Sequence, residues 1–432
     1  MELGTRALED LVMFGDVYAG RRVFVTGHTG FKGSWLTLWL LELGAEVTGY
    51  ALDPPTEPNL FEVAGICVVD AGSSSAGKAR RTKCAGRLTD LRADVLDRRP
   101  LSQALEMVAP EIVFHLAAQP FVRRSYGEPH LTYETNVMGT VNLLEEVRAL
   151  AAARHGPRAV VNVTSDKCYE NLETGHAYAE VDALGGFDPY SSSKACSELV
   201  TAAYRQSFFS GPGMPQVATA RAGNVIGGGD WGEDRILPAC ARALGAGVPI
   251  EVRNPGAVRP WQHVLESLSG YLWLGASLLR GAEAGVAAGD ETSAGAGDGA
   301  GGCDKAGAFA DEMAGGCDGA WNFGPGAECN VTVRDVVELF VKAWGAGEWR
   351  PALGAAQQPH EAGLLVLDAT KARRELGWRS VWDTPAAVAA AAGWYKAYYG
   401  GAQSDALVAR MRTDIAAYVD AARTLGLPWA GE

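Results

Sequence analysis

A short apolar run that breaks into glycines and resumes as an apolar helix constrains this chain more than any other feature. Residues 23–26, VFVT, are β-branched or aromatic and predict a buried strand. Gly27, Gly30 and Gly33 follow, and residues 35–44 have the composition of an apolar helix. Glycines at this spacing let a backbone turn tightly and approach a pyrophosphate, which a helix N-terminus stabilises. The stretch predicts a dinucleotide loop, with a purely structural turn as the alternative.

The residues after the loop favour the dinucleotide. A second predicted strand, residues 46–52, stops at Asp53, where a carboxylate would accept hydrogen bonds from the adenosine ribose. Because an acid there disfavours a 2′-phosphate, we expect NAD rather than NADP. Asp94 and Val95 close a further strand, where the carboxylate would meet adenine or cap a helix. Lys32 would neutralise pyrophosphate charge or face solvent at the helix start.

Short apolar runs alternate with helical patterns from residue 23 to residue 149, which is typical of βαβ units. We therefore expect the α/β class, with a Rossmann-type doubly wound parallel sheet and a smaller α/β substrate-binding C-terminal lobe. The expected division is an N-terminal lead at 1–19, an NAD-binding domain at 20–224 and a mainly substrate-binding lobe at 225–432. The lobe is expected to return partly to the sheet.

Two stretches have the composition of inserts. Residues 71–86 read as a polar loop that carries glycines and several basic side chains. Residues 281–320 are rich in glycine and alanine and have almost nothing to bury. Because such a segment cannot offset the entropy lost on ordering, we expect it to be disordered.

Charge and cysteine usage exclude several classes of protein. The formal net charge of −13 argues against nucleic acid or an anionic membrane as partner, because both require surplus Lys and Arg. An anionic substrate would then need a locally basic pocket. No apolar run of about 18 residues is present, and the first residues do not read as a secretory signal. The eight cysteines form no C-x-x-C pair, which favours reduced thiols in the cytoplasm and no metal site.

Two polar groups carry the candidate chemistry. Tyr190 and Lys194 are four residues apart at the start of a predicted helix and so share one face. A phenol is a poor base at neutral pH because its pKa is about 10. A neighbouring ammonium and the positive charge of oxidised nicotinamide would both favour the phenolate. Tyr190 is therefore a candidate base for a sugar hydroxyl.

The second polar group follows a predicted buried strand at 159–163. Side chains at the carboxyl end of a parallel strand face the ligand crevice of this fold class. Ser165 would share the hydrogen bonds of Tyr190. Asp166 and Lys167 add an acid and a base that simple dehydrogenation does not need, unless they form only a solvated turn.

Seven motifs in this order resemble those of the extended short-chain dehydrogenase/reductase superfamily, and within it the nucleotide-sugar 4,6-dehydratases. They are TGHTGFKG, HLAAQP, NVMGTVNLLE, TSDKCY, PYSSSKACSE, RAGNVIGGGDWGEDRILP and RPWQHVLESLSGYL. The segments GHTGFKGSW, GGGDW and RPWQHV resemble most closely the branch that acts on CDP-glucose. The likeness covers about residues 20–280 and resumes at 321–325 and 361–378.

The resemblance implies a reaction. Tyr190 would deprotonate the glucose 4-hydroxyl while hydride passes to NAD, with Lys194 lowering the phenol pKa and holding the nicotinamide ribose. Asp166 would protonate the departing 6-hydroxyl. Lys167 stands where many sister dehydratases carry glutamate, and its role as the C-5 base is a hypothesis, because lysine is a base only when neutral. The implied product is CDP-4-keto-6-deoxyglucose.

The resemblance also implies binding residues. Further NAD contacts are expected from Phe31, Ala117 and Ala118. Asn224 is similar to the family's residue that meets the diphosphate, and Arg235 and Arg259 are similar to the cations on its two phosphates. His263 is a further substrate candidate, with simple packing as the alternative.

Other functions remain open at this point. A nucleotide-sugar 4-epimerase shares the Tyr/Lys pair but needs no acid and base at 166–167. A dehydratase could take dTDP-glucose or GDP-mannose instead, and an NAD-sensing regulator could keep the fold without catalysis. A homodimer or higher homo-oligomer is expected from the resemblance, through predicted helices at 131–153 and 189–207.

Overall fold

The computed structural model describes residues 13–66, 84–291, 317–352 and 364–431. Most of the N-terminal lead lies outside this part of the chain, as do residues 71–83 of the first insert. The second insert lies outside it at 292–316.

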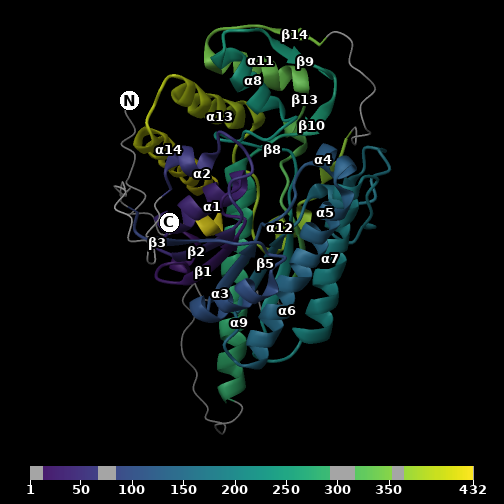
Figure 1. Cartoon of the computed structure of the whole chain (residues 1–432), viewed down its shortest axis with the longest axis vertical. Coiled ribbons are helices and arrows are strands. Elements are labelled where there is room, and N and C mark those ends of the chain that lie inside the picture. The colour runs from purple at the N-terminus through teal and green to yellow at the C-terminus, as the bar shows by residue number, and fades with distance from the viewer. Residues whose placement is uncertain (1–12, 67–83, 292–316, 353–363, 432) are drawn as a thin grey trace.

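A seven-stranded sheet forms the centre of the molecule (Figure 1). Its strand order is β12-β7-β5-β4-β1-β2-β3, and all its pairings are parallel. The strands are β1 (Arg22–Thr26), β2 (Glu46–Ala51), β3 (Arg87–Arg92), β4 (Ile112–His115), β5 (Ala159–Val163), β7 (Gln216–Arg221) and β12 (Gly319–Asn322). The predicted α/β class with a parallel sheet is confirmed.

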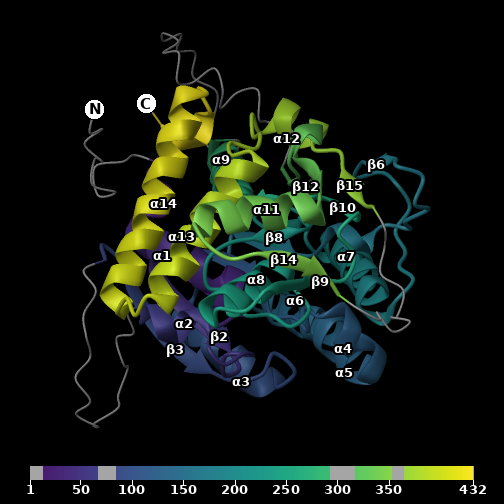
Figure 2. The same cartoon turned by 90° about the horizontal axis from the view of Figure 1, so that it is seen from above.

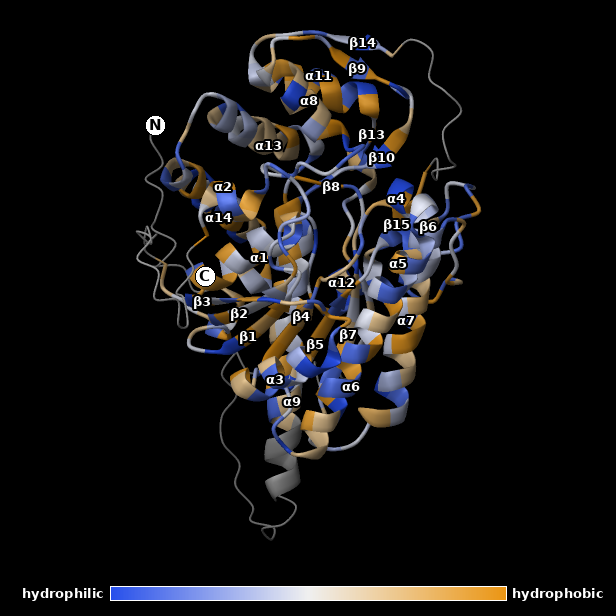
Figure 3. Cartoon of the chain, viewed as in Figure 1, coloured by the Kyte–Doolittle hydropathy of each residue, from blue (hydrophilic) through white to orange (hydrophobic). Residues whose placement is uncertain are grey.

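Helices cover both faces of this sheet, because successive strand side chains point to opposite sides. Phe24 and Val160 belong to one hydrophobic cluster, and Val25 and Val161 belong to the other. Figure 3 shows the central strands as predominantly hydrophobic. The first face carries α3 (Arg98–Val108), α6 (Gly139–Ala152) and α7 (Pro189–Phe208), and the second carries α1 (Phe31–Glu42) and α9 (Val264–Glu291).

The strand order reverses between β1 and β4. From β1 the chain proceeds to β2 and β3 on one side, and it then returns to β4 on the other side of β1. Ligands of doubly wound sheets bind outside the carboxyl ends of the strands at such a reversal. The loops after β1, β4 and β5 therefore meet where a ligand is expected.

A smaller lobe lies over the carboxyl ends of the strands (Figures 1 and 2). In it β10 pairs antiparallel with β13, and β9 pairs parallel with β14. Its elements are α8 (Ile236–Gly245), β9 (Ile250–Val252), β10 (Val258–Pro260), β13 (Asn330–Thr332), α11 (Val333–Trp344), β14 (Trp349–Pro351) and α13 (Thr384–Tyr399). The domain boundary near residue 224 stays a prediction, although α9 and β12 lie in or against the main sheet.

The remaining elements connect these layers, and one of them, α14, runs along the outside next to α13 and α2. They are α2 (Leu60–Ala64), α4 (Val122–Gly127), α5 (Pro129–Tyr133), a π-helical turn (Glu134–Met138), β6 (Ala177–Tyr178), β8 (Val225–Ile226), β11 (Gln262–His263), β15 (Val366–Leu367), α12 (Thr370–Glu375) and α14 (Ser404–Thr424). In the described part of the chain, no helix has the length and apolarity needed to cross a bilayer.

Helix α9 extends into the segment for which disorder was expected. The helix continues through residues 281–291, the first part of the Gly/Ala-rich insert. Several of these residues are alanines, which favour helix, and a helix already formed can be extended without a new nucleation step. The composition therefore did not locate the end of the helix.

A buried carboxylate at the start of α9 holds the C-terminal segment. Glu266 is fully buried and accepts hydrogen bonds from the backbone N–H groups of Val381 and Trp382 and from the Tyr418 hydroxyl, at 2.7–3.1 Å. Burial raises the pKa of Glu266 to about 7, although these three donors act to lower it. A pKa raised in the folded state contributes stability that is present at low pH and lost as pH rises through that value.

We expect Glu266→Gln to remove the loss of folding stability that the wild-type protein shows as pH rises. An amide can keep the hydrogen bonds, whereas the wild-type carboxylate must ionise inside the core. The free energy of unfolding of the variant should therefore rise relative to wild type by on the order of 2 kcal/mol between pH 5 and pH 8. Urea unfolding at several pH values measures this, with Glu106→Gln on the exposed side of α3 as control. A difference that does not change with pH would contradict the prediction.

Candidate active site

The glycine loop between β1 and α1 is shaped by close backbone contacts. Gly27 has a φ of +74°, and a Cβ on it would lie 2.7 Å from the backbone nitrogen of Ala117. A Cβ on Gly33 would lie 2.1 Å from the carbonyl oxygen of Gly27. Gly30 is the N-cap of α1, and no side chain caps the helix there. The loop and the helix N-terminus thus form a cradle that fits a pyrophosphate.

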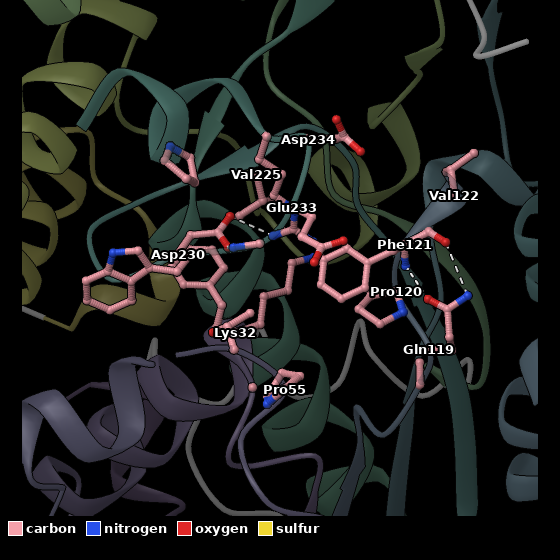
Figure 4. Close-up of a pocket in the computed structure, with 18 of the residues that line it drawn as sticks. Lys32, Pro55, Gln119, Pro120, Phe121, Val122, Val225, Asp230, Glu233 and Asp234 are labelled. Carbon is pink, nitrogen blue, oxygen red and sulfur yellow. Dashed lines mark hydrogen bonds and ion pairs between the residues drawn. The ribbon is translucent and has the colours of Figure 1, made fainter. Parts of the chain in front are cut away.

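A cleft of about 880 Å³ opens beside this loop, between the sheet and the smaller lobe (Figure 4). Every candidate site residue from the sequence lines the cleft except His263. The His263 ring is fully buried, with the rings of Trp35 and Trp382 centred 5.9 and 5.0 Å away. The structure therefore contradicts His263 as a substrate contact and supports the packing alternative, because β11 places the ring in the core.

The start of α7 presents Tyr190 and Lys194 to the cleft. Pro189 occupies the first turn, and the Asp188 side chain caps the helix by accepting a hydrogen bond from the Ser191 N–H at 2.9 Å. Both Tyr190 and Lys194 are buried. The Lys194 ammonium donates to the carbonyl oxygen of Val163, the last residue of β5, at 3.3 Å. Helix α7 and strand β5 thus meet at the candidate catalytic groups.

Burial controls the ionisation of both groups. It raises the pKa of Tyr190 to about 12, against which a hydrogen bond with Ser165 and the charge of Arg235 act to lower it. The sequence led us to expect this role from Lys194, and that role stays a prediction; Arg235 is a further cation that acts on the phenol. Burial lowers the pKa of Lys194 to about 8, and the carboxylate of Glu198 acts to raise it.

We call residues 164–167 the strand-end turn. Its Asp166 is buried and accepts hydrogen bonds from the Ser165 hydroxyl at 2.9 Å and from the Asn224 amide at 3.4 Å. Lys167 lies in the same cleft. A Cβ on Gly223 would lie 1.9 Å from a carboxylate oxygen of Asp166, so only glycine leaves room for this acid. No motif argument had singled out Gly223.

Lys32 points into the cleft rather than to solvent (Figure 4). Its ammonium donates to the Tyr271 hydroxyl at 3.2 Å. Burial lowers the pKa of Lys32 to about 7; the charges of Arg235 and Lys194 act in the same direction, and that of Asp166 acts against them. Lys32 therefore belongs to the charge network of the candidate catalytic groups, which the glycine pattern did not indicate.

Two arginines supply the expected positive charge on the substrate side. Arg235 is paired with Asp230 at 2.6 Å, and its guanidinium lies 5.6 Å from the centre of the Phe121 ring. Arg259 donates to the carbonyl oxygen of Val258 at 2.9 Å and lines the cleft. Their contact with phosphates stays a prediction.

The other end of the cleft carries the acids expected at the adenosine. The Asp53 side chain follows β2 and is 93% exposed. Asp94 lines the cleft, and one of its oxygens accepts a hydrogen bond from the Leu96 N–H at 2.9 Å. Leu96 lies in the turn before α3, whose N-cap residue is Asp97, so this bond closes a turn and Asp94 does not cap the helix. Among the described residues, no cluster of three or more His, Cys, Asp or Glu is placed to hold a metal ion.

A buried ion pair below the site was also not expected. Glu198 and Arg221 form it at 2.8 Å, and both are buried. Glu198 lies four residues after Lys194, so the helical period could have indicated it as a neighbour. Its partner comes from β7, and no spacing in the sequence connects the two.

Two curated proteins resemble this chain over most of its length. A CDP-glucose 4,6-dehydratase from Salmonella typhimurium is 42% identical over 94% of this chain and 98% of its own length. A dTDP-glucose 4,6-dehydratase from Streptomyces antibioticus is 29% identical over 87% of this chain and 92% of its own.

Solved structures share the fold at lower identity. A UDP-glucose 4-epimerase from Thermotoga maritima superposes with a TM-score of 0.61 at 19% identity, over 87% of this chain and 99% of its own. A dTDP-glucose 4,6-dehydratase from Streptomyces venezuelae, with NAD bound, has a TM-score of 0.60 at 22% identity, over 88% and 98%.

A family model matches residues 23–285, the part of the chain that holds the glycine loop, the strand-end turn and the Tyr190/Lys194 pair. The family is described as NAD-dependent, which agrees with the cofactor expected from Asp53. On this match and on the relative from Salmonella typhimurium, the chain belongs to the NAD dependent epimerase/dehydratase family.

Proposed function

We propose that the protein converts CDP-glucose into CDP-4-keto-6-deoxyglucose and water. One observation supports elimination of water above all others: Asp166 and Lys167 line the same cleft as Tyr190, next to Ser165. The curated relative from Salmonella typhimurium is a CDP-glucose 4,6-dehydratase, and it supports the choice of substrate.

The residues divide the proton transfers among them. NAD, held at the glycine loop, would supply the hydride acceptor for C-4 of the sugar and afterwards the hydride donor for C-6. Tyr190 takes the proton of the 4-hydroxyl, and the resulting ketone acidifies the proton on C-5. Lys167 takes that proton, and Asp166 protonates the 6-hydroxyl, which leaves as water. Return of a proton to C-5 completes a reaction with no net oxidation.

The phenol needs positive charge to act as a base. With a pKa raised to about 12 by burial, Tyr190 is protonated at neutral pH. The charge of Arg235 lowers that pKa, and the positive nicotinamide ring of oxidised NAD would lower it further. Proton removal is thereby linked to the presence of the oxidised cofactor.

The remaining expectations are part of the proposal. A homodimer or higher oligomer is supported by exposed apolar side chains such as Leu131 and Tyr133 on α5 and Leu199 and Phe208 on α7. The net charge of −13 supports an enzyme without a nucleic-acid partner. The eight cysteines without a C-x-x-C pair support a cytoplasmic location. Residues up to about 224 would bind NAD, and those beyond would mainly bind the sugar nucleotide.

Incubation with CDP-glucose, dTDP-glucose and GDP-mannose, separately and with NAD, tests the function. We expect a 4-keto sugar from CDP-glucose, detected by mass spectrometry. A ketone from another sugar would correct the substrate, and a new epimer without ketone would indicate a 4-epimerase. No product from any of them, together with tight NAD binding, would indicate a regulator.

Replacement of Lys167 tests the base. Lys167→Ala should still transfer hydride to NAD, because Tyr190 is intact, but should lose exchange of the C-5 proton with solvent. Absorbance of NADH and deuterium incorporation measure the two steps separately. Lys342→Ala, on the exposed side of α11, is the control. Unimpaired exchange in Lys167→Ala would exclude this lysine as the base.

Replacement of Gly223 tests the position of the acid. Gly223→Ala should displace the Asp166 carboxylate and lower kcat by about 100-fold or more. NAD binding should be retained, because the three atoms nearest to a Cβ on Gly223 all belong to Asp166 and none to the glycine loop. Gly256→Ala is the matched control, because a Cβ there meets no atom within 4 Å. Equal activity of the two variants would show that Asp166 tolerates the shift.

A further inference from the structure

Two opposite charges lie at the place where the adenosine ribose is expected. Asp53 follows β2, and Arg92 is the last residue of the neighbouring strand β3. The parallel register pairs Ala51 with Arg92, so the two side chains emerge next to each other. An Arg92 terminal nitrogen, Nη1, lies 3.3 Å from an Asp53 carboxylate oxygen. The acid expected to select NAD is therefore paired with a positively charged side chain.

Arg92 is held from its other side. Its Nε and Nη2 donate to the Asp90 carboxylate at 2.8–3.0 Å, and its guanidinium lies 5.2 Å from the centre of the Phe61 ring. Asp90 in turn is bonded at 2.8 Å to Nε2 of His28, a residue of the glycine loop. Because Asp90 occupies Nε and Nη2, Nη1 is the nitrogen directed at Asp53, with the carbonyl of Leu52 at 3.5 Å.

We propose that Arg92 is a second determinant of cofactor selectivity. Its guanidinium is already positioned to bind the 2′-phosphate of NADP, and the Asp53 carboxylate prevents it from doing so. In the wild-type chain the positive charge of Arg92 faces two carboxylates, Asp90 and Asp53. The group formed by Arg92, Asp90 and Asp53 then has an excess of negative charge, which repels a phosphate. Without the Asp53 charge, Nη1 can donate to a phosphate oxygen while Asp90 still fixes the guanidinium.

Asp53 can be replaced without releasing Arg92 from its position. The Asp53 side chain is 93% exposed, so its removal disturbs no packing, whereas the Asp90 side chain is 11% exposed and held by two partners. The inference concerns cofactor binding and does not depend on the sugar substrate. It extends the sequence argument, in which Asp53 alone excluded NADP.

Direct binding of NAD and of NADP to the full chain tests the proposal. Calorimetry is applied to wild type, Asp53→Asn, Arg92→Gln and the double variant. We expect Asp53→Asn to bind NADP at least about tenfold more tightly than wild type does, because a hydrogen bond to a charged group replaces a repulsion. The double variant should lose most of that gain.

The controls separate this role from a structural one. Arg87→Gln removes an exposed arginine at the other end of β3 and should change neither affinity. Thermal unfolding of each variant shows whether the fold is intact. Equal NADP affinity of Asp53→Asn and the double variant would overturn the proposal. No gain of NADP affinity in Asp53→Asn would overturn it as well.

Discussion

The buried ion pair between Glu198 and Arg221 joins the elements that carry the site. Glu198 lies on α7 four residues after Lys194, and its carboxylate accepts hydrogen bonds from Arg221 on β7 at 2.8 and 2.9 Å. It also accepts one from the hydroxyl of Thr164, which opens the strand-end turn. Although burial acts to raise it, Arg221 holds the pKa of Glu198 below its usual value. Removing either partner would leave a buried charge uncompensated, at a cost of about 3–5 kcal/mol.

The same network reaches the edge of the sheet. Arg221 donates to the Tyr169 hydroxyl at 2.6 Å, and that hydroxyl donates to Asn322 in β12 at 2.8 Å. The Asn322 amide in turn donates to the backbone of Tyr178 and Asp368. Segments separated by about half the chain are thus fixed to one another by buried polar groups. This explains how a short turn can hold an acid and a base in register with the tyrosine of a different element.

Charge inside the cleft differs from the charge of the whole chain. The protein carries a net charge of −13, yet Lys32, Lys194 and Arg235 converge on the cleft. Burial lowers the pKa values of the two lysines to about 7 and 8, so their charged forms are held at a cost. Anionic diphosphates bound beside them would favour the charged forms. The negative charge of the ligand and the positive charge of the lysines therefore stabilise each other, although the chain as a whole carries a net negative charge.

The strand–glycine–helix unit, the parallel sheet, and nearly all candidate residues of the cleft could be predicted from the sequence, because each depends on neighbours close in the chain. The alternation of strand and helix patterns, the spacing of the glycines and the four-residue step from Tyr190 to Lys194 are local patterns. The partners of those residues are not local. Four such contacts depend on which distant segments pack together. Gly223 leaves space for Asp166, and Arg235 acts on the Tyr190 phenol. His263 is buried in the core, and Arg92 faces Asp53. Contacts of this kind arise when distant segments pack, and no spacing along a single chain encodes them.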